Sequence, residues 1–161
     1  MMLMLANGLT AKPVQAQEMP DDYQEVLAYL GKKGDFKAGV LKVSIPRNDL
    51  KVTVAGVETP TPFGFGGWLA MTKGEGGFEV MMGDFVLLQE EVNPVMSALL
   101  DNGLEVTALH NHFFWEEPRL FYHHMLGARP AIIFLHYWGQ GSAEQLAQGF
   151  RAALDELGRS K

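Results

Sequence analysis

Residues 78–112 read FEVMMGDFVLLQEEVNPVMSALLDNGLEVTALHNH, and this stretch decides the predicted fold. Residues 78–88 are rich in Val, Met, Phe and Leu and indicate two short strands around a Gly-Asp pair. Residues 92–100 predict a short helix, for which Asn93 is the candidate cap. Residues 104–112 then predict another strand. Strands and a helix therefore follow one another closely in this part of the chain.

The flanking sequence adds further strands and helices. Further strands are predicted at residues 40–45, 50–54, 68–72 and 131–137, with the first two forming a hairpin and the polar run 32–37 forming a turn. Further helices are predicted at residues 21–30, ended by Gly31, and at residues 142–157, capped by Ser142. This order predicts one α+β domain, with an antiparallel or mixed sheet and flanking helices.

The amino-acid composition argues against some partners and against some kinds of metal site. The 161 residues hold 13 Lys and Arg against 19 Asp and Glu, for a net charge of -6, and no basic run is present. A nucleic acid is therefore not an expected partner, because phosphate backbones are held by clustered positive charge. Cysteine is absent, so any bound metal would be held by nitrogen and oxygen. No apolar run approaches the roughly 20 residues of a transmembrane segment.

All five histidines fall between residues 110 and 136. His110 and His112 lie two apart on a predicted strand and so project from the same face. His136 lies on the next predicted strand and could complete a three-nitrogen metal site. A lone histidine in a strand is more often a half-buried structural residue, so the pattern, rather than any one histidine, supports the prediction. His110, His112 and His136 are the predicted ligands.

Several neighbours could assist such a site. Glu117 is the candidate fourth ligand or general base, although an acidic turn is the alternative reading. Arg119, His124 and Glu91 are candidates for supporting the ligands or contacting a substrate. Aromatic residues flank the histidines; strand aromatics are typical of a core, and the alternative is a ring that stacks on a sugar.

Five short stretches resemble one family when taken together. They are VSIPRNDL at residues 43–50, GDFVL at 83–87, EVNPV at 91–95, VTALHNH at 106–112 and EPR at 117–119. They are similar to the LppY/LpqO family of exported bacterial proteins and lipoproteins, whose activity is unassigned. The resemblance covers about residues 21–157 and implies a single domain at 21–158. No lipobox cysteine is present, so a lipid anchor is not implied.

The chain departs from that family in one segment. Relative to the family, residues 120–133 are an apparent insertion, which brings His123 and His124 and leaves their role open. A weaker similarity is to the cupin pattern of H-x-H followed by Glu, which makes a cupin-like β-barrel the alternative fold. The predicted helices at residues 92–100 and 142–157 favour the α+β arrangement instead.

The first 20 residues predict a leader. Residues 1–6 are apolar, and Val14-Gln15-Ala16 resembles a signal-peptidase site, but a basic start is missing. We interpret residues 1–20 as a clipped export signal, with a disordered leader as the alternative. Together with the family resemblance, this predicts a periplasmic or secreted protein.

Three functional hypotheses follow from these residues. The first is an exported metalloprotein that binds one divalent transition metal (zinc, copper, iron, nickel or manganese) and acts as a hydrolase or oxidoreductase on a small molecule or carbohydrate. The second is a binding protein that carries or senses the metal without turnover. The third is a metal-free structural or interaction domain. An open coordination position would separate the first two, and metal analysis would identify the third.

Overall fold

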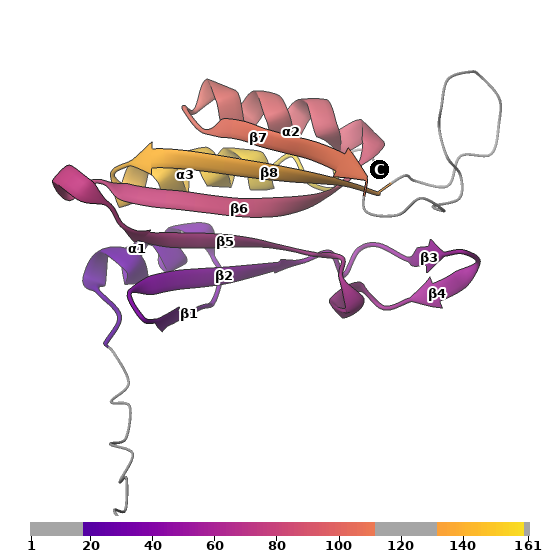
Figure 1. The fold of residues 1–161 in the computed structure, drawn as a ribbon, viewed down its shortest axis with the longest axis horizontal. Helices are drawn as coiled ribbons and strands as arrows, with labels where there is room; N and C mark the ends of the chain where they lie inside the picture. Colours follow the sequence, from indigo (N-terminus) through magenta and orange to yellow (C-terminus); the bar gives the residue numbers. More distant parts are fainter. Residues whose placement is uncertain (1–17, 112–131, 160–161) are drawn as a thin grey trace, which may run out of the picture.

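The computed structural model describes residues 18–111 and 132–159 as a sheet with helices along one side (Figure 1). In chain order its helices and strands are α1 (Asp21–Leu30), β1 (Gly34–Lys37), β2 (Val40–Pro46), β3 (Val52–Val54), β4 (Val57–Thr59), β5 (Gly66–Lys73), β6 (Glu79–Leu88), α2 (Gln89–Asp101), β7 (Glu105–Asn111), β8 (Ile132–Gly141) and α3 (Ala143–Leu154). Two short 3-10 helices, η1 (Thr61–Phe63) and η2 (Glu75–Gly77), flank β5. No helix among the described residues has the length and apolar character needed to cross a bilayer.

The main sheet has six antiparallel strands in the order β1-β2-β5-β6-β8-β7. Strands β3 and β4 form a separate hairpin that projects from one end (Figure 1). The six-stranded sheet is open and does not close into a barrel. The predicted α+β class is therefore confirmed, and the cupin-like alternative is wrong.

The helices pack against only one of the two faces of the sheet. On β2 the buried side chains alternate with exposed ones, as the period of a strand covered on one face requires. The covered face packs against all three helices in the main core, to which α1 contributes Tyr23, α2 contributes Leu99 and α3 contributes Phe150. The opposite face carries a small second cluster, made of Val52, Phe65, Val86 and Phe134. Most of the open face is therefore left to side chains that do not belong to the core.

Two helices end or begin where the sequence predicts. Gly31 ends α1 in the left-handed conformation, and its N–H reaches the carbonyl of Ala28. Ser142 caps α3 by accepting the N–H of Gln145 at 3.2 Å. The prediction for α2 was wrong at its start: it begins at Gln89 and not at residue 92. Glu91 accepts the N–H of Leu88 at 2.8 Å and so closes an earlier first turn.

The hairpins also differ from the prediction. Strand β2 pairs with β1 and β5, and not with residues 50–54, whose last three residues form β3 and pair with β4. Residues 34–37 are a strand rather than a turn. Both hairpins turn through Ala-Gly pairs with positive φ, 53° and 80° at Ala38-Gly39 and 49° and 80° at Ala55-Gly56. The usual sequence signal for such turns is Asn-Gly or Asp-Gly, so Ala-Gly gave no warning.

Strand β6 runs unbroken through the Gly83-Asp84 pair, where a turn between two strands was expected. The hydroxyl of Tyr137 crosses β6 to donate to the carbonyl of Trp68 at 3.0 Å. A Cβ on Gly83 would lie 2.0 Å from that hydroxyl oxygen and 2.3 Å from the carbonyl oxygen of Trp68. Glycine is therefore required here by close packing and not by a turn. The next residue, Asp84, consequently stays in register and projects from the open face.

Candidate functional site

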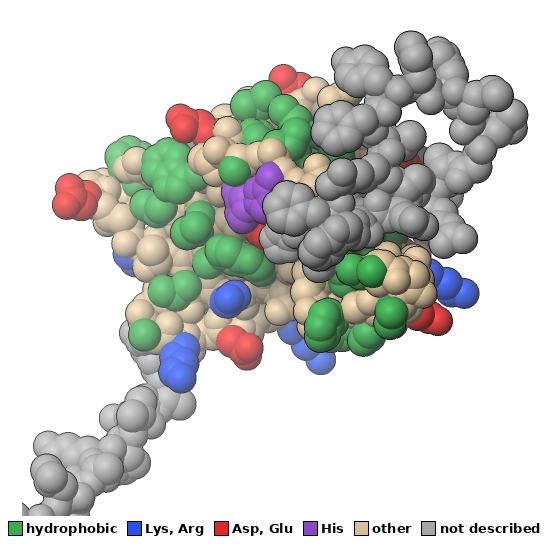
Figure 2. Space-filling view, turned by 45° about the vertical axis from the view of Figure 1, so that its right-hand side comes forward, with side chains coloured by type: hydrophobic (Ala, Val, Ile, Leu, Met, Phe, Trp, Pro, Cys, Tyr) green, Lys and Arg blue, Asp and Glu red, His purple; other side chains and the backbone are tan. Residues whose placement is uncertain are grey.

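Three polar side chains from three strands meet on the open face of the sheet. Asp84 on β6 is directly opposite His136 on β8. His110 on β7 is opposite Phe134, so it lies diagonally from His136 on the same face. Figure 2 shows the histidines at this surface, beside an acidic side chain and a group of hydrophobic ones. The antiparallel order of β6, β8 and β7 is what brings these residues together.

The two imidazoles face each other through their Nε2 atoms. These atoms are 2.9 Å apart, whereas the ring centroids are 5.0 Å apart and the ring planes differ by 20°. The rings therefore meet edge to edge at their Nε2 corners and do not lie face to face. His110 also lies nearly parallel to the ring of Phe134, with centroids 6.0 Å apart. His110 therefore lies beside the second cluster, to which Phe134 belongs.

The other nitrogen of each imidazole lies near an oxygen that can only accept a hydrogen bond. Nδ1 of His110 is 3.3 Å from the carbonyl oxygen of Asn111. Nδ1 of His136 is 3.9 Å from Oδ1 of Asp84, a residue that is 8% exposed. The first distance allows a hydrogen bond from an Nδ1–H of His110, whereas the second is too long for a hydrogen bond and leaves only an electrostatic contact between His136 and Asp84. A neutral ring with its proton on Nδ1 has its lone pair on Nε2. With that tautomer in both rings two lone pairs face each other, whereas an Nε2–H on one ring makes the 2.9 Å contact a hydrogen bond.

The structure thus brings together two of the three predicted metal ligands, His110 and His136. The third, His112, lies outside the described residues, as do Glu117, Arg119 and His124. Within the described ranges 18–111 and 132–159, no three His, Asp or Glu side chains are placed to hold one ion. The described part of the site is therefore a facing pair of imidazoles with a buried carboxylate behind one of them.

Comparison with models of protein families shows which family the chain matches. Residues 24–128 and 123–156 match the family described as Domain of Unknown Function (DUF1259). The chain belongs to the DUF1259 family. The two matched pieces meet at residues 123–128, inside the segment 120–133 that sequence analysis treats as an insertion. This DUF1259 domain matches no curated protein and no solved structure.

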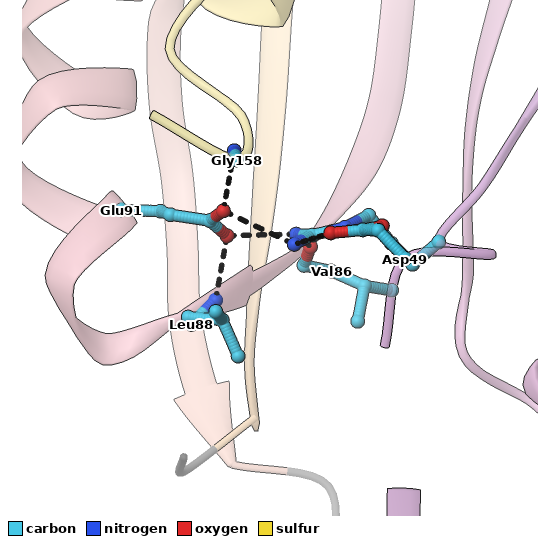
Figure 3. A network of polar contacts seen from close by, with 6 residues as sticks. Asp49, Val86, Leu88, Glu91 and Gly158 are labelled. Atoms are coloured by element: carbon cyan, nitrogen blue, oxygen red, sulfur yellow. Dashed lines mark hydrogen bonds and ion pairs between the residues drawn. The ribbon is translucent and has the colours of Figure 1, made fainter. Parts of the chain in front are cut away.

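In this DUF1259 domain the structure places Glu91, the remaining candidate, in a buried ion pair. Its carboxylate accepts two hydrogen bonds from Arg47, at 2.7 and 3.0 Å, and one from the N–H of Gly158 at 2.7 Å (Figure 3). Glu91 is 0% exposed and Arg47 3%. These contacts join the start of α2 to the segment after β2 and to the end of the chain after α3. We assign Glu91 to holding these elements together.

Arg47 completes the same cluster. Its guanidinium also donates to both carboxylate oxygens of Asp49 at 3.0 Å and to the carbonyl of Val86 at 2.6 Å. Burial by itself lowers the pKa of Arg47, but the hydrogen bonds to Asp49 and Glu91 outweigh this, so the pKa lies above its ordinary value. The guanidinium of Arg47 therefore keeps its charge although it is buried.

Sequence analysis missed Asp84 as a site residue. A signal was present, because Asp84 is the one carboxylate in the apolar run of residues 80–88. An acid in such a run is unusual unless it is paired or bound. We read the Gly-Asp pair as a turn, which hid this signal. The strand register then shows that Asp84 lies opposite His136.

Proposed function

We propose that this DUF1259 domain binds one divalent transition-metal ion on the open face of its sheet, with His110 and His136 as ligands. The observation that carries this proposal is the 2.9 Å separation of their Nε2 atoms. His112 and Glu117, which follow His110 in the sequence, are proposed as the further ligands, with Glu117 as the alternative general base.

The protonation pattern supports a cation at this point. With Nδ1–H directed at Asn111 and Asp84, both Nε2 atoms present lone pairs to each other. Two lone pairs this close repel, and either an Nε2–H on one ring, which makes the contact a hydrogen bond, or a metal ion bound by both nitrogens relieves that repulsion. Two imidazole nitrogens about 2.1 Å from one tetrahedral ion are roughly 3.4 Å apart, so a small rotation of either ring would let both nitrogens bind one ion.

Asp84 supports the metal reading further. Ligating histidines commonly donate their second N–H to a carboxylate or a backbone carbonyl, which fixes the ring and strengthens the ligand. The carboxylate of Asp84 and the carbonyl of Asn111 supply one acceptor of each kind. A bound cation would also offset the cost of the buried negative charge on Asp84.

The types of ligand atom limit which metals the proposed site would bind. Imidazole nitrogen and carboxylate oxygen suit zinc, copper, iron, nickel or manganese better than calcium or magnesium. An ion of this group supplies Lewis-acid or redox chemistry when it keeps an open coordination position. We therefore propose hydrolytic or oxidative chemistry on a small molecule. We further propose that the chain is of the LppY/LpqO type and is exported, which rests on the motifs at 43–50, 83–87, 91–95, 106–112 and 117–119 and on the leader-like residues 1–20.

The test is metal content. Protein purified without a polyhistidine tag is expected to hold about one equivalent of metal per chain, by elemental analysis and by titration of the apoprotein with zinc. The His110→Ala/His136→Ala variant is expected to lose it, whereas His123→Ala, which removes a histidine outside the proposed set, keeps it. Circular dichroism of the metal-free proteins controls for folding. Equal metal content in the wild type and the double variant would overturn the proposal.

A further inference from the structure

The open face continues past the histidines as an apolar surface. Trp68 on β5 is opposite Asp84, which is opposite His136, so all three project from this face in one row. In the next row Ala70 is opposite Met82, and Met82 is opposite Trp138. Trp138 is two residues from His136 on β8 and therefore its neighbour on the same face. An aromatic surface thus adjoins the proposed metal ligands.

This surface is exposed although it is apolar. Met82 is 51% exposed and Trp138 is 36% exposed, while the helices cover only the opposite face. Figure 2 shows hydrophobic side chains gathered next to the histidines. Side chains of this size on a flat face suit a ring that lies against them, because indole and thioether groups pack well on planar rings. We define Trp68, Met82 and Trp138 as the ring platform.

Charge is distributed unevenly around the ring platform. Lys42 lies in the same row as Met82 and Trp138, opposite Ala70, and its Nζ is 4.9 Å from the centre of the Trp68 ring. At the other end of that row, Glu105 is opposite Trp138. A ligand with one negative group is therefore directed with that group toward Lys42 and away from Glu105.

We propose that the ring platform binds a small ring-bearing carboxylate, with its ring against Trp138 and Met82 and its carboxylate at Lys42. This proposal deepens the proposed function. It rests on that function in one respect, because it places the bound ring next to the proposed metal ion. An aromatic acid and a uronic sugar share this chemistry, because both carry a carboxylate on a ring with an apolar face. Acetate lacks the ring, and benzamide lacks the charge.

The test follows the indole N–H signals of the three tryptophans in ¹H–¹⁵N spectra, assigned with Trp→Phe variants. Benzoate and glucuronate are titrated separately into zinc-loaded and zinc-free protein. At least one of them is expected to shift the Trp68 and Trp138 signals saturably, and the probe that does so identifies the aromatic or the sugar source. Acetate and benzamide are expected to bind more weakly. No saturable shift with either acid, or equal affinity for acetate, would overturn the proposal.

Variants locate the binding surface. Trp138→Ala is expected to weaken binding by about fivefold and Lys42→Gln by about threefold, the sizes typical of an aromatic contact and an exposed ion pair. Tyr29→Ala on α1 and Lys33→Gln, which also remove an exposed aromatic and an exposed cation, are expected to change nothing. If Trp138→Ala instead changes the oligomeric mass by light scattering, the surface is an interface between copies and the proposal is overturned.

The zinc content of each variant separates the two proposals. Retained zinc without ring binding would overturn the ring platform and leave the metal site standing. Ring binding by a wild-type protein that takes up no zinc on titration would overturn the metal site and leave the ring platform standing.

Discussion

The Arg47–Glu91 cluster and the His110–His136 pair are both polar contacts between segments far apart in the sequence, but they are built from opposite kinds of partner. In the cluster a buried cation meets two carboxylates, and all five guanidinium N–H groups donate to Asp49, Glu91 or the Val86 carbonyl. In the pair, two imidazoles of the same kind meet at 2.9 Å. The first contact joins opposite charges within the chain, whereas the second is the one at which we propose that a metal cation binds.

This difference separates a contact that stabilises the fold from the contact that we propose binds a metal. A cluster whose charges cancel and whose donors are all used holds elements in place, and it gains nothing from a ligand. The two imidazoles of the pair lie within hydrogen-bond distance of each other, and the nitrogens that meet there are also atoms that can ligate a metal. On our proposal, such a pair gains free energy when its nitrogen lone pairs bind a metal cation. The comparison predicts that variants of the cluster change stability and variants of the histidine site change affinity.

The largest expected effect is on the cluster. Glu91→Ala leaves Arg47 buried with one partner lost, and the free energy of unfolding is expected to fall by about 3–5 kcal/mol. Urea denaturation followed by circular dichroism measures it. Arg47→Met/Glu91→Met removes both charges and should lose clearly less than the single variant. A loss below about 1 kcal/mol for Glu91→Ala would mean that the cluster does not hold these elements together.

The second effect is on affinity. Asp84→Asn keeps the shape of the side chain but removes the negative charge behind His136, and zinc affinity is expected to fall by about 10- to 100-fold. Isothermal titration of the apoprotein measures it. The exposed Asp35→Asn on β1 is the matched control and should bind like the wild type. Unchanged affinity in Asp84→Asn would remove this carboxylate from the site.

The smallest effect concerns Tyr137, which follows His136 but lies on the covered face. Burial, and secondarily the charge of Asp84, raise the pKa of Tyr137 well above its ordinary value of 10.0. Above pH 10 the unfolded chain therefore loses this proton while the folded protein keeps it. The contribution of the neutral Tyr137 hydroxyl to the free energy of unfolding is fully present below pH 10. It decreases as the pH rises above 10.

Tyr137→Phe tests that dependence. The variant is expected to lose about 1 kcal/mol at neutral pH, because the hydrogen bond to the Trp68 carbonyl is gone. Above pH 10 the free energy of unfolding of the variant should decrease less steeply than that of the wild type. The two slopes should differ by about 1.4 kcal/mol per pH unit. Urea denaturation at a series of pH values measures both, with the exposed Tyr29→Phe as the control. Parallel curves for Tyr137→Phe and wild type would contradict the buried neutral hydroxyl.

The ends of helices were predictable from the sequence where residues close in the chain determine them. Gly31 ends α1 and Ser142 begins α3 because a left-handed residue and a capping hydroxyl act within one turn of the chain. The start of α2 was not predictable in the same way. It depends on Glu91, whose carboxylate is fixed by Arg47, a residue far away in the sequence.

The candidate site divides in the same manner. The concentration of histidines between residues 110 and 136 and the absence of cysteine are properties of the sequence, and they were sufficient to predict imidazole ligands from neighbouring strands. Which residues meet was decided by the register of β6, β8 and β7, which put Asp84 opposite His136 and His110 one step away on the same face. The alternation of apolar residues specifies which face of a strand is buried, but the partner of each residue depends on pairings between distant segments and on packing such as that of Tyr137 over Gly83.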